Sequence, residues 1–308
     1  MTARPAFAAH FDAVARFVAA AAGPGEVLFA SLRAERSDFV RVNRARVRQA
    51  GTVERATVSL RLIDGGRQAR MTCTLGESES MQAVLAGGLA ELRAAVAQLP
   101  VDPHACWQPV PGSSERVDGA GVPDAGVVID AIVAAAEGDD LVGLYAAGPV
   151  VRALASSLGH RHYHETVSST FDFSVQVGGD RAVKDTWFAE RWDAQSLRAA
   201  IGAARERARV LRRPPRRLAP GDHRVLLAPQ ALAELVALLG WGGFSERAWR
   251  SGQSPLARAT RGEAALHPSL TLVDDLDAFG VPRFQADGFE RPARVALVEA
   301  GRPAQRLV

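Results

Sequence analysis

The chain has 308 residues, of which 47% are hydrophobic and 23% are charged. This composition is typical of a folded globular protein of up to two domains and excludes a largely disordered chain. The net charge of +3 is too small to imply a nucleic-acid partner. No apolar run approaches the roughly 20 residues that cross a bilayer, and the N-terminus lacks a secretory signal pattern. We therefore expect a cytoplasmic protein with no membrane partner.

The first hundred residues predict helix, then strands, then helix. Residues 5–22 carry apolar side chains at helical spacing, and Gly23-Pro24-Gly25 predicts the end of that helix. Helical spacing returns over residues 80–99. Between the two helices, the alternation of apolar and polar residues predicts an antiparallel meander with one solvated face. Its strands are expected at 27–32, 39–42, 46–49, 56–63 and 69–75.

The middle of the chain opens with a stretch rich in Pro, Gly and Ser, which predicts a linker or long surface loop over about 100–123. Helices are expected at 125–137 and 193–211, with a short connection over 149–158. Strands are expected at 141–147, 160–167, 170–177 and 182–188.

An arginine-rich run, Arg205–Arg217, follows the last of these helices. It most simply forms a solvated helix end and an exposed linker. The alternative is an anion or nucleic-acid patch, which would make the chain a nucleic-acid-binding or regulatory module. No aromatic residue interleaves the run to stack on bases, so we do not expect nucleic acid as a partner.

A second module begins after Pro220-Gly221. A strand is expected over 223–228 and a helix over 229–239, with Pro229 at its beginning. An irregular, Gly/Ser-rich stretch covers 240–261, and strands are expected at 270–273 and 294–299. The sequence thus predicts an α+β fold. An N-terminal and central domain with an antiparallel meander would occupy 1–217, and the start of a β-rich C-terminal domain would occupy 222–308.

Three histidines, His160, His162 and His164, form the most metal-like pattern and are followed by Glu165. Residues two apart on a strand face the same way. Three imidazoles could therefore hold zinc and leave one position open for water, which Glu165 would help to polarise. Side chains two apart lie roughly 6.5–7 Å from each other, so they meet on one ion only if the strand is distorted. The alternative is a strand whose histidines bond to their neighbours.

Other catalytic patterns are absent from the sequence. There is no Gly-x-Ser-x-Gly elbow and no phosphate loop with its lysine. A zinc-peptidase helix would read His-Glu-x-x-His or His-Glu-x-x-x-His. His164-Glu165 begins such a pattern, but Ser168 and Ser169 stand where the second histidine would be. We predict no catalytic and no cofactor-binding residue, and the three histidines stay the only metal candidates.

Several stretches, in their order along the chain, resemble the TldD/PmbA family of bacterial and archaeal proteins. The segments SDFVRVN (37–43) and VRQAG (47–51) look like the family's N-terminal strand pair. The order of its central region is followed at 140–148, 155–159, 164–165 and 182–184. Its C-terminal domain is resembled at 221–229, Ser254, 270–275, Phe284, Asp287-Gly288 and Pro292.

In this family, one type of subunit carries a His-Glu-x-x-x-His helix and is a zinc peptidase acting on unfolded or small peptides. The other type lacks that motif and pairs with the first. Aligned on Ser254, the family's His-Glu falls near Ala237-Leu238 and its second histidine near Gly242, and none of these residues can bind zinc. The resemblance implies a PmbA/TldE-like subunit without zinc of its own.

The resemblance also implies the partners. They would be a TldD-like catalytic subunit that holds the zinc, in a heterodimer, or a second copy of the chain, together with a peptide substrate. Family members are usually longer, so we expect a C-terminally shortened member or a fragment. An active metallopeptidase that uses His160, His162 and His164 stays open as an alternative.

Overall fold

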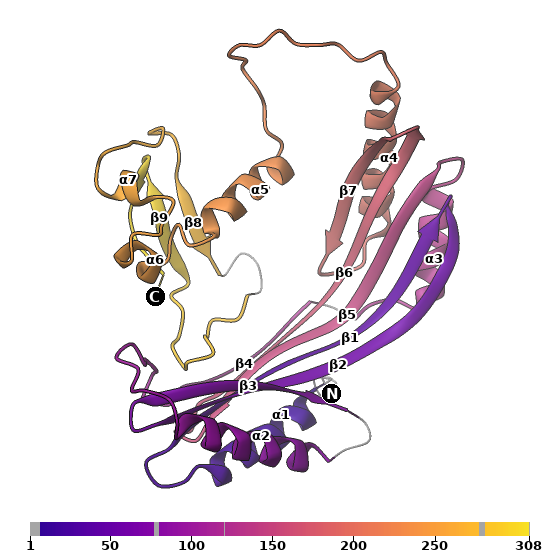
Figure 1. The fold of residues 1–308 in the computed structure, drawn as a ribbon. Helices are drawn as coiled ribbons and strands as arrows, with labels where there is room; N and C mark the ends of the chain where they lie inside the picture. The colour runs from indigo at the N-terminus through magenta and orange to yellow at the C-terminus, as the bar shows by residue number, and fades with distance from the viewer. Residues whose placement is uncertain (1–6, 77–79, 120, 277–280, 308) are drawn as a thin grey trace. The chain divides into compact units, whose positions relative to one another are not determined.

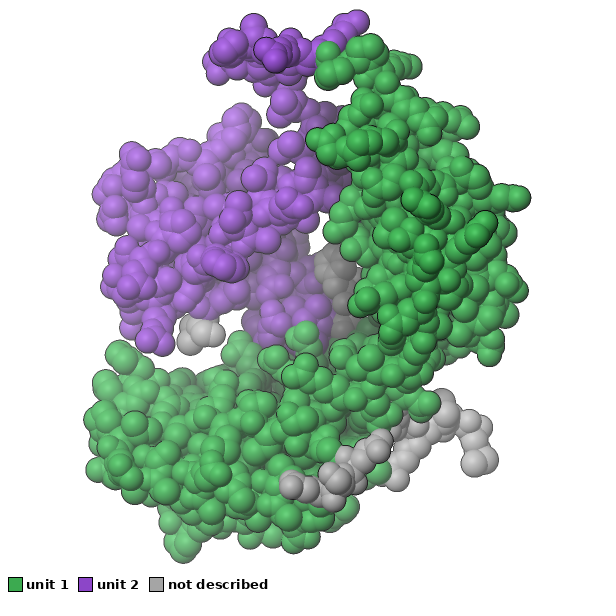
Figure 2. Space-filling view, turned by 45° about the vertical axis from the view of Figure 1, so that its right-hand side comes forward, with its two compact units in different colours: residues 1–215, 284–290 green, residues 216–283, 291–308 purple. Residues whose placement is uncertain are grey.

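The computed structural model describes residues 7–76, 80–119, 121–276 and 281–307 (Figure 1). The chain divides into two compact units, which Figure 2 shows in different colours. Unit 1 comprises Met1–Pro215 with Phe284–Glu290, and unit 2 comprises Arg216–Arg283 with Arg291–Val308. The short segment Phe284–Glu290 thus belongs to unit 1. The expected division, in contrast, assigns all of residues 222–308 to the C-terminal domain.

Unit 1 is built on one sheet. In the described residues its strand order is β3-β2-β1-β5-β6-β4, and β7 also pairs with β6. All neighbours are antiparallel except β4 and β6, which are parallel. The strands are long and bend together (Figure 1). Their bounds are β1 Val27–Asn43, β2 Arg46–Asp64, β3 Arg67–Leu75, β4 Ser113–Asp118, β5 Leu141–Ser156, β6 Arg161–Gly178 and β7 Arg181–Ala189.

Four helices of unit 1 pack on one and the same face of this sheet. They are α1 (Ala8–Ala21), α2 (Met81–Val96), α3 (Ala125–Ala135) and α4 (Ala194–Leu211). On β1, Leu28 and Leu32 pack in the cluster with α1 and α2, whereas Val40 and Val42 pack in the cluster with α3 and α4. All four positions are even-numbered on one continuous strand, so their side chains point the same way. We call this the covered face and the opposite one the open face.

The predicted α+β class and antiparallel meander are confirmed, but several strands are longer than predicted. The two strands expected within 27–42 are one strand, β1, and the connection expected over 149–158 mostly belongs to β5. Proline cannot donate a ladder hydrogen bond, so Pro149 looked like a strand end. The ladder between β1 and β5 is indeed interrupted there, and it resumes at Glu35 and Val150.

The expected linker over 100–123 is wrong in part, because residues 113–118 form β4 along the first half of β6. This strand reads SSERVD, with no apolar alternation to reveal it, and it gains its order from pairing with β6. The strand expected over 223–228 is also wrong. Those residues form no strand and Leu226 is 98% exposed, because β propensity is insufficient where no strand lies alongside.

Unit 2 combines short helices with a small sheet of order β10-β9-β8. The helices are α5 (Pro229–Gly240), α6 (Glu246–Arg250) and α7 (Ala257–Thr260), of which the last two lie in the stretch expected to be irregular. The strands are β8 (Leu272–Asp275), β9 (Arg294–Glu299) and β10 (Arg302–Pro303). Its buried core is small and consists of Phe244, Leu256, Val295, Leu297 and Val298. No helix in the described parts of the chain is long and apolar enough to span a membrane.

Candidate functional site

The three candidate histidines are all buried, and each is held by its own polar partner. His160 Nδ1 lies 2.8 Å from Ser156 Oγ, and His162 Nδ1 lies 2.9 Å from Ser114 Oγ on β4. His164 Nε2 lies 2.9 Å from the carboxylate of Asp118, also on β4. The edge strand that the sequence did not reveal therefore orients two of the three imidazoles.

His160 and His162 come together, whereas His164 turns away towards Asp118. The rings of the first two lie 6.2 Å apart, and the buried Nε2 atom of each has no hydrogen-bond partner among the described residues. Burial lowers the pKa of both imidazoles, and the charge of Glu290 opposes that shift at His162. No group of three or more His, Cys, Asp or Glu in the described ranges is arranged to hold a metal ion.

Glu165 does not share a face with the histidines, which corrects its expected role beside a zinc-bound water. It points to the covered face, where the hydroxyl of Tyr163 donates a 2.5 Å hydrogen bond to its carboxylate. Glu165 is an odd number of positions along the chain from each histidine, which explains this, because side chains alternate along a strand. Burial, with the bond to Glu165, raises the pKa of Tyr163.

The segment Phe284–Glu290 covers His160 and His162 on the open face. It turns back on itself through a bridge between Phe284 and Glu290. The Phe284 ring stacks on His162 with centroids 5.0 Å apart and planes 20° apart. Gly288 has φ +86°, and a Cβ there would lie 2.8 Å from His160 Nε2. Glycine is required at this position by both its backbone conformation and the close approach of the imidazole.

An ion pair anchors the same segment to β2. The buried Arg61 donates to Asp287 Oδ1 at 2.7 Å, and it also bonds the Cys106 carbonyl and the Gln68 side chain. The backbone N–H of Gln108 donates to the carbonyl of Asp287. The order Phe284, Asp287-Gly288, singled out in the sequence, is thus explained by docking of this segment on the sheet.

Helix α5 occupies the place where the resemblance puts the catalytic helix of zinc peptidases. It contains no histidine, and its single carboxylate, Glu234, is exposed. None of its residues is buried, and Leu232, Leu235, Leu238 and the following Trp241 are between 46% and 88% exposed. A helix with this apolar exposure is typical of an interaction surface.

The arginine-rich run is partly neutralised within unit 1. Arg205 bonds Asp139, Arg207 bonds Asp185 and Arg209 bonds Glu206. The arginines from residue 212 onward are exposed. The first part of the run therefore serves α4 and its neighbours, as the simpler interpretation expects.

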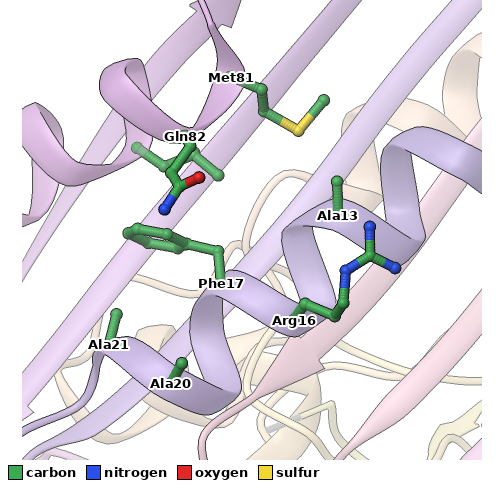
Figure 3. A pocket seen from close by; sticks show the side chains of 8 residues that line it. Ala13, Arg16, Phe17, Ala20, Ala21, Met81 and Gln82 are labelled. Carbon is green, nitrogen blue, oxygen red and sulfur yellow. The ribbon is translucent and has the colours of Figure 1, made fainter.

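Two hollows of unit 1 differ in chemistry. The first lies between α1 and α2 (Figure 3), has a volume of about 380 Å³ and is lined by Ala13, Arg16, Phe17, Ala20, Ala21, Met81, Gln82 and Leu85. Its polar side chains are Arg16 and Gln82, and the remaining lining residues are apolar. The second, of about 430 Å³, lies over β1, β2 and β5 and is lined by Arg33, Glu35, Arg55, Thr57, Ser59, Thr72 and Arg152, among others.

Comparisons with known proteins gave one family match and several structural neighbours. Residues 220–308 match the family model of the PmbA/TldA metallopeptidase C-terminal domain. A search of the curated proteins gave no significant match. Three solved structures share the fold at low identity. The first is TldE from Thermococcus kodakarensis, with a TM-score of 0.64 and 15% identity, covering 91% of this chain and 66% of that one.

The other two are described as putative modulators of DNA gyrase. The Thermotoga maritima protein has a TM-score of 0.69 and 14% identity, covering 98% of this chain and 70% of that one. The Bacteroides thetaiotaomicron protein has a TM-score of 0.65 and 15% identity, covering 98% of this chain and 72% of that one. The chain thus spans about two thirds of the length of these relatives. Residues 220–308 thus match the PmbA/TldA metallopeptidase C-terminal domain, and the chain shares its fold with these structures over nearly all of its length.

Proposed function

We propose that the chain is the non-catalytic, PmbA/TldE-like subunit of a TldD-type zinc metallopeptidase that degrades or processes peptides in the cytoplasm. The observation that carries this proposal is the composition of α5. A hydrolytic zinc site of this kind needs two imidazoles from one helix and a glutamate as general base. Positions 237, 238 and 242 offer Ala, Leu and Gly.

The exposed apolar side of α5 supports the same proposal. Leu235, Leu238 and Trp241 leave water only if another surface covers them, and burying apolar area is the main driving force of association. A TldD-like catalytic subunit, which would bring the zinc, is the partner that the family offers. The solved relative named TldE is consistent with this assignment.

The alternative, a zinc peptidase built on His160, His162 and His164, has less support. His164 uses Nε2 for Asp118, and Glu165 lies on the other face of the sheet. A zinc ion at these residues would need His164 to leave its carboxylate partner and the histidine rings to move towards each other.

The test is reconstitution. The chain and a TldD-like subunit are expressed separately and together, and each preparation is assayed with an unfolded peptide. We expect a stable complex with chelator-sensitive activity that the chain alone lacks. A variant with Leu238→Asp and Trp241→Asp should weaken the complex, whereas Leu226→Asp, also exposed but outside α5, should not. Peptidase activity of the chain alone would overturn the proposal.

A further inference from the structure

The hollow on the open face over β1, β2 and β5 contains a concentration of positive charge that the sheet does not neutralise. Arg33 on β1 and Arg152 on β5 are direct cross-strand partners. Arg33 is odd-numbered on β1 and Arg152 even-numbered on β5, so both side chains point to the open face, where they line the hollow. Like charges directly opposite each other on a sheet are destabilising.

Nearby groups do not compensate this pair. Neither Arg33 nor Arg152 forms an ion pair within the residues that the structure describes, and nor does Arg55. Among the described residues, Glu35 is the only carboxylate that lines the hollow, and its cross-strand partner on β2 is Arg55. Three guanidinium groups thus surround one carboxylate, which leaves a local excess of positive charge over the hollow.

The surrounding side chains extend this pattern into a polar floor. Ser59 and Thr72 share a 2.7 Å hydrogen bond, and Thr57 donates to the carbonyl of Arg33. These hydroxyls give the hollow a largely polar floor, with Val150 as the apolar side chain beside them on the open face. We propose that the hollow is a carboxylate-binding subsite in which Arg33 and Arg152 together hold an acidic side chain or the free C-terminus of a peptide. This rests on the proposed function, because it deepens what the subunit contributes to peptide binding.

The chemistry favours a carboxylate over a nucleic-acid backbone. Guanidinium groups bind planar carboxylates through two parallel hydrogen bonds, and a pair of facing arginines suits one such group. Glu35 would repel a continuous run of phosphates. In the part of the chain that the structure describes, no aromatic side chain lines the hollow, so bases would find no ring there to stack on.

The experiment measures binding to the full chain without any partner subunit, by calorimetry at low ionic strength. The probes are acetyl-tetraglutamate amide, its tetraglutamine counterpart, and tetraglycine with a free or an amidated C-terminus. The glutamate peptide tests side-chain carboxylates, and the tetraglycine pair tests the terminal carboxylate. We expect at least one carboxylate-bearing probe to bind and its neutral counterpart not to bind.

The variant is Arg33→Gln with Arg152→Gln, and its matched control is Arg212→Gln with Arg213→Gln, which removes the same charge from an exposed stretch. We expect the first pair to weaken binding at least tenfold and the control to change it less than twofold. The Arg33→Gln, Arg152→Gln variant should have an unchanged or higher Tm, because it relieves repulsion between like charges. An unchanged or higher Tm would show that the variant is folded and that the loss of binding is not caused by unfolding.

Equal binding by both double variants, or no binding of any carboxylate probe, would overturn the proposal. So would a single-stranded oligonucleotide that binds more tightly than the peptides and depends on Arg33 and Arg152. Each of these outcomes leaves the reconstitution test of the partner-subunit role unaffected, because that test does not use the isolated chain's affinity for carboxylates.

Discussion

The two faces of the sheet in unit 1 use the same strands for different purposes. The covered face buries apolar residues such as Leu60 and Phe171 under four helices. The open face carries arginines, hydroxyls and histidines, and at one end it is covered by Phe284–Glu290. Because side chains alternate along a strand, one residue in two faces the helices and the other faces the open face. At the covered end of the open face, Phe29, Ile63 and Leu154 are buried as well. The stability and the chemistry of the unit should therefore respond to different substitutions.

The largest difference is expected from matched truncations on the two faces. Phe171 is fully buried on the covered face, whereas Leu144, on the adjacent strand, is 42% exposed on the open face. Phe171→Ala should lower the free energy of unfolding by about 3–5 kcal/mol, through lost burial and a cavity. Leu144→Ala should change it by about 0.5 kcal/mol or less. Urea unfolding measures both, and similar losses would contradict the comparison.

The next effect concerns the covered end of the open face. Asp287→Asn removes the charge that pairs with the buried Arg61, and we expect a loss of about 1–3 kcal/mol. The matched control is Arg70→Gln, which removes the exposed member of the same network and should cost well under 1 kcal/mol. Thermal unfolding of the two variants gives the comparison. An Arg70 variant as unstable as the Asp287 variant would mean that the buried partner is not the important one.

The stability of the folded chain should depend on pH because of the buried histidines. Burial lowers the pKa of His160 and His162 below the usual value of 6.5, so the unfolded chain takes up protons before the folded one. Their contribution to stability is complete above about pH 6.5 and declines as the pH falls towards the lowered values. The Tm should therefore fall between pH 7 and pH 5. His162→Gln should flatten that slope, and His104→Gln, at an exposed histidine, should not.

The smallest effect is expected at the helix surface. Arg209 and Glu206 form an ion pair on α4 with side chains 63% and 65% exposed. Glu206→Gln should change the free energy of unfolding by at most about 0.5 kcal/mol, and added salt should reduce that change further. A larger loss in chemical denaturation would mean that the arginine-rich run takes part in structure beyond its own helix.

The parts of the fold with a strong local period could be predicted from the sequence. Helices α2 and α4 and the strands of the meander show the spacing of their buried residues directly. Strand β4 could not be predicted, because its order comes from pairing with β6. The continuity of β5 through Pro149 depends on an interruption in the ladder to β1, which only the paired structure shows.

The candidate site was predictable in its residue types but not in its geometry. Regular alternation brought His160, His162 and His164 to one face, as expected. The contact of Asp118 with His164, and the return of Phe284 onto His162, join segments far apart in the sequence. The pairing of Arg33 with Arg152, which are more than a hundred positions apart, also depends on the register of β1 against β5.

The most direct test of the zinc-free role is the metal content of the isolated chain, purified without a partner and measured by mass spectrometry. We expect far less than one equivalent of zinc, and no change in Tm when a chelator is added. The complex with a TldD-like subunit should hold zinc that a chelator removes. One tightly held equivalent of zinc in the chain alone, lost on His162→Gln, would contradict the account.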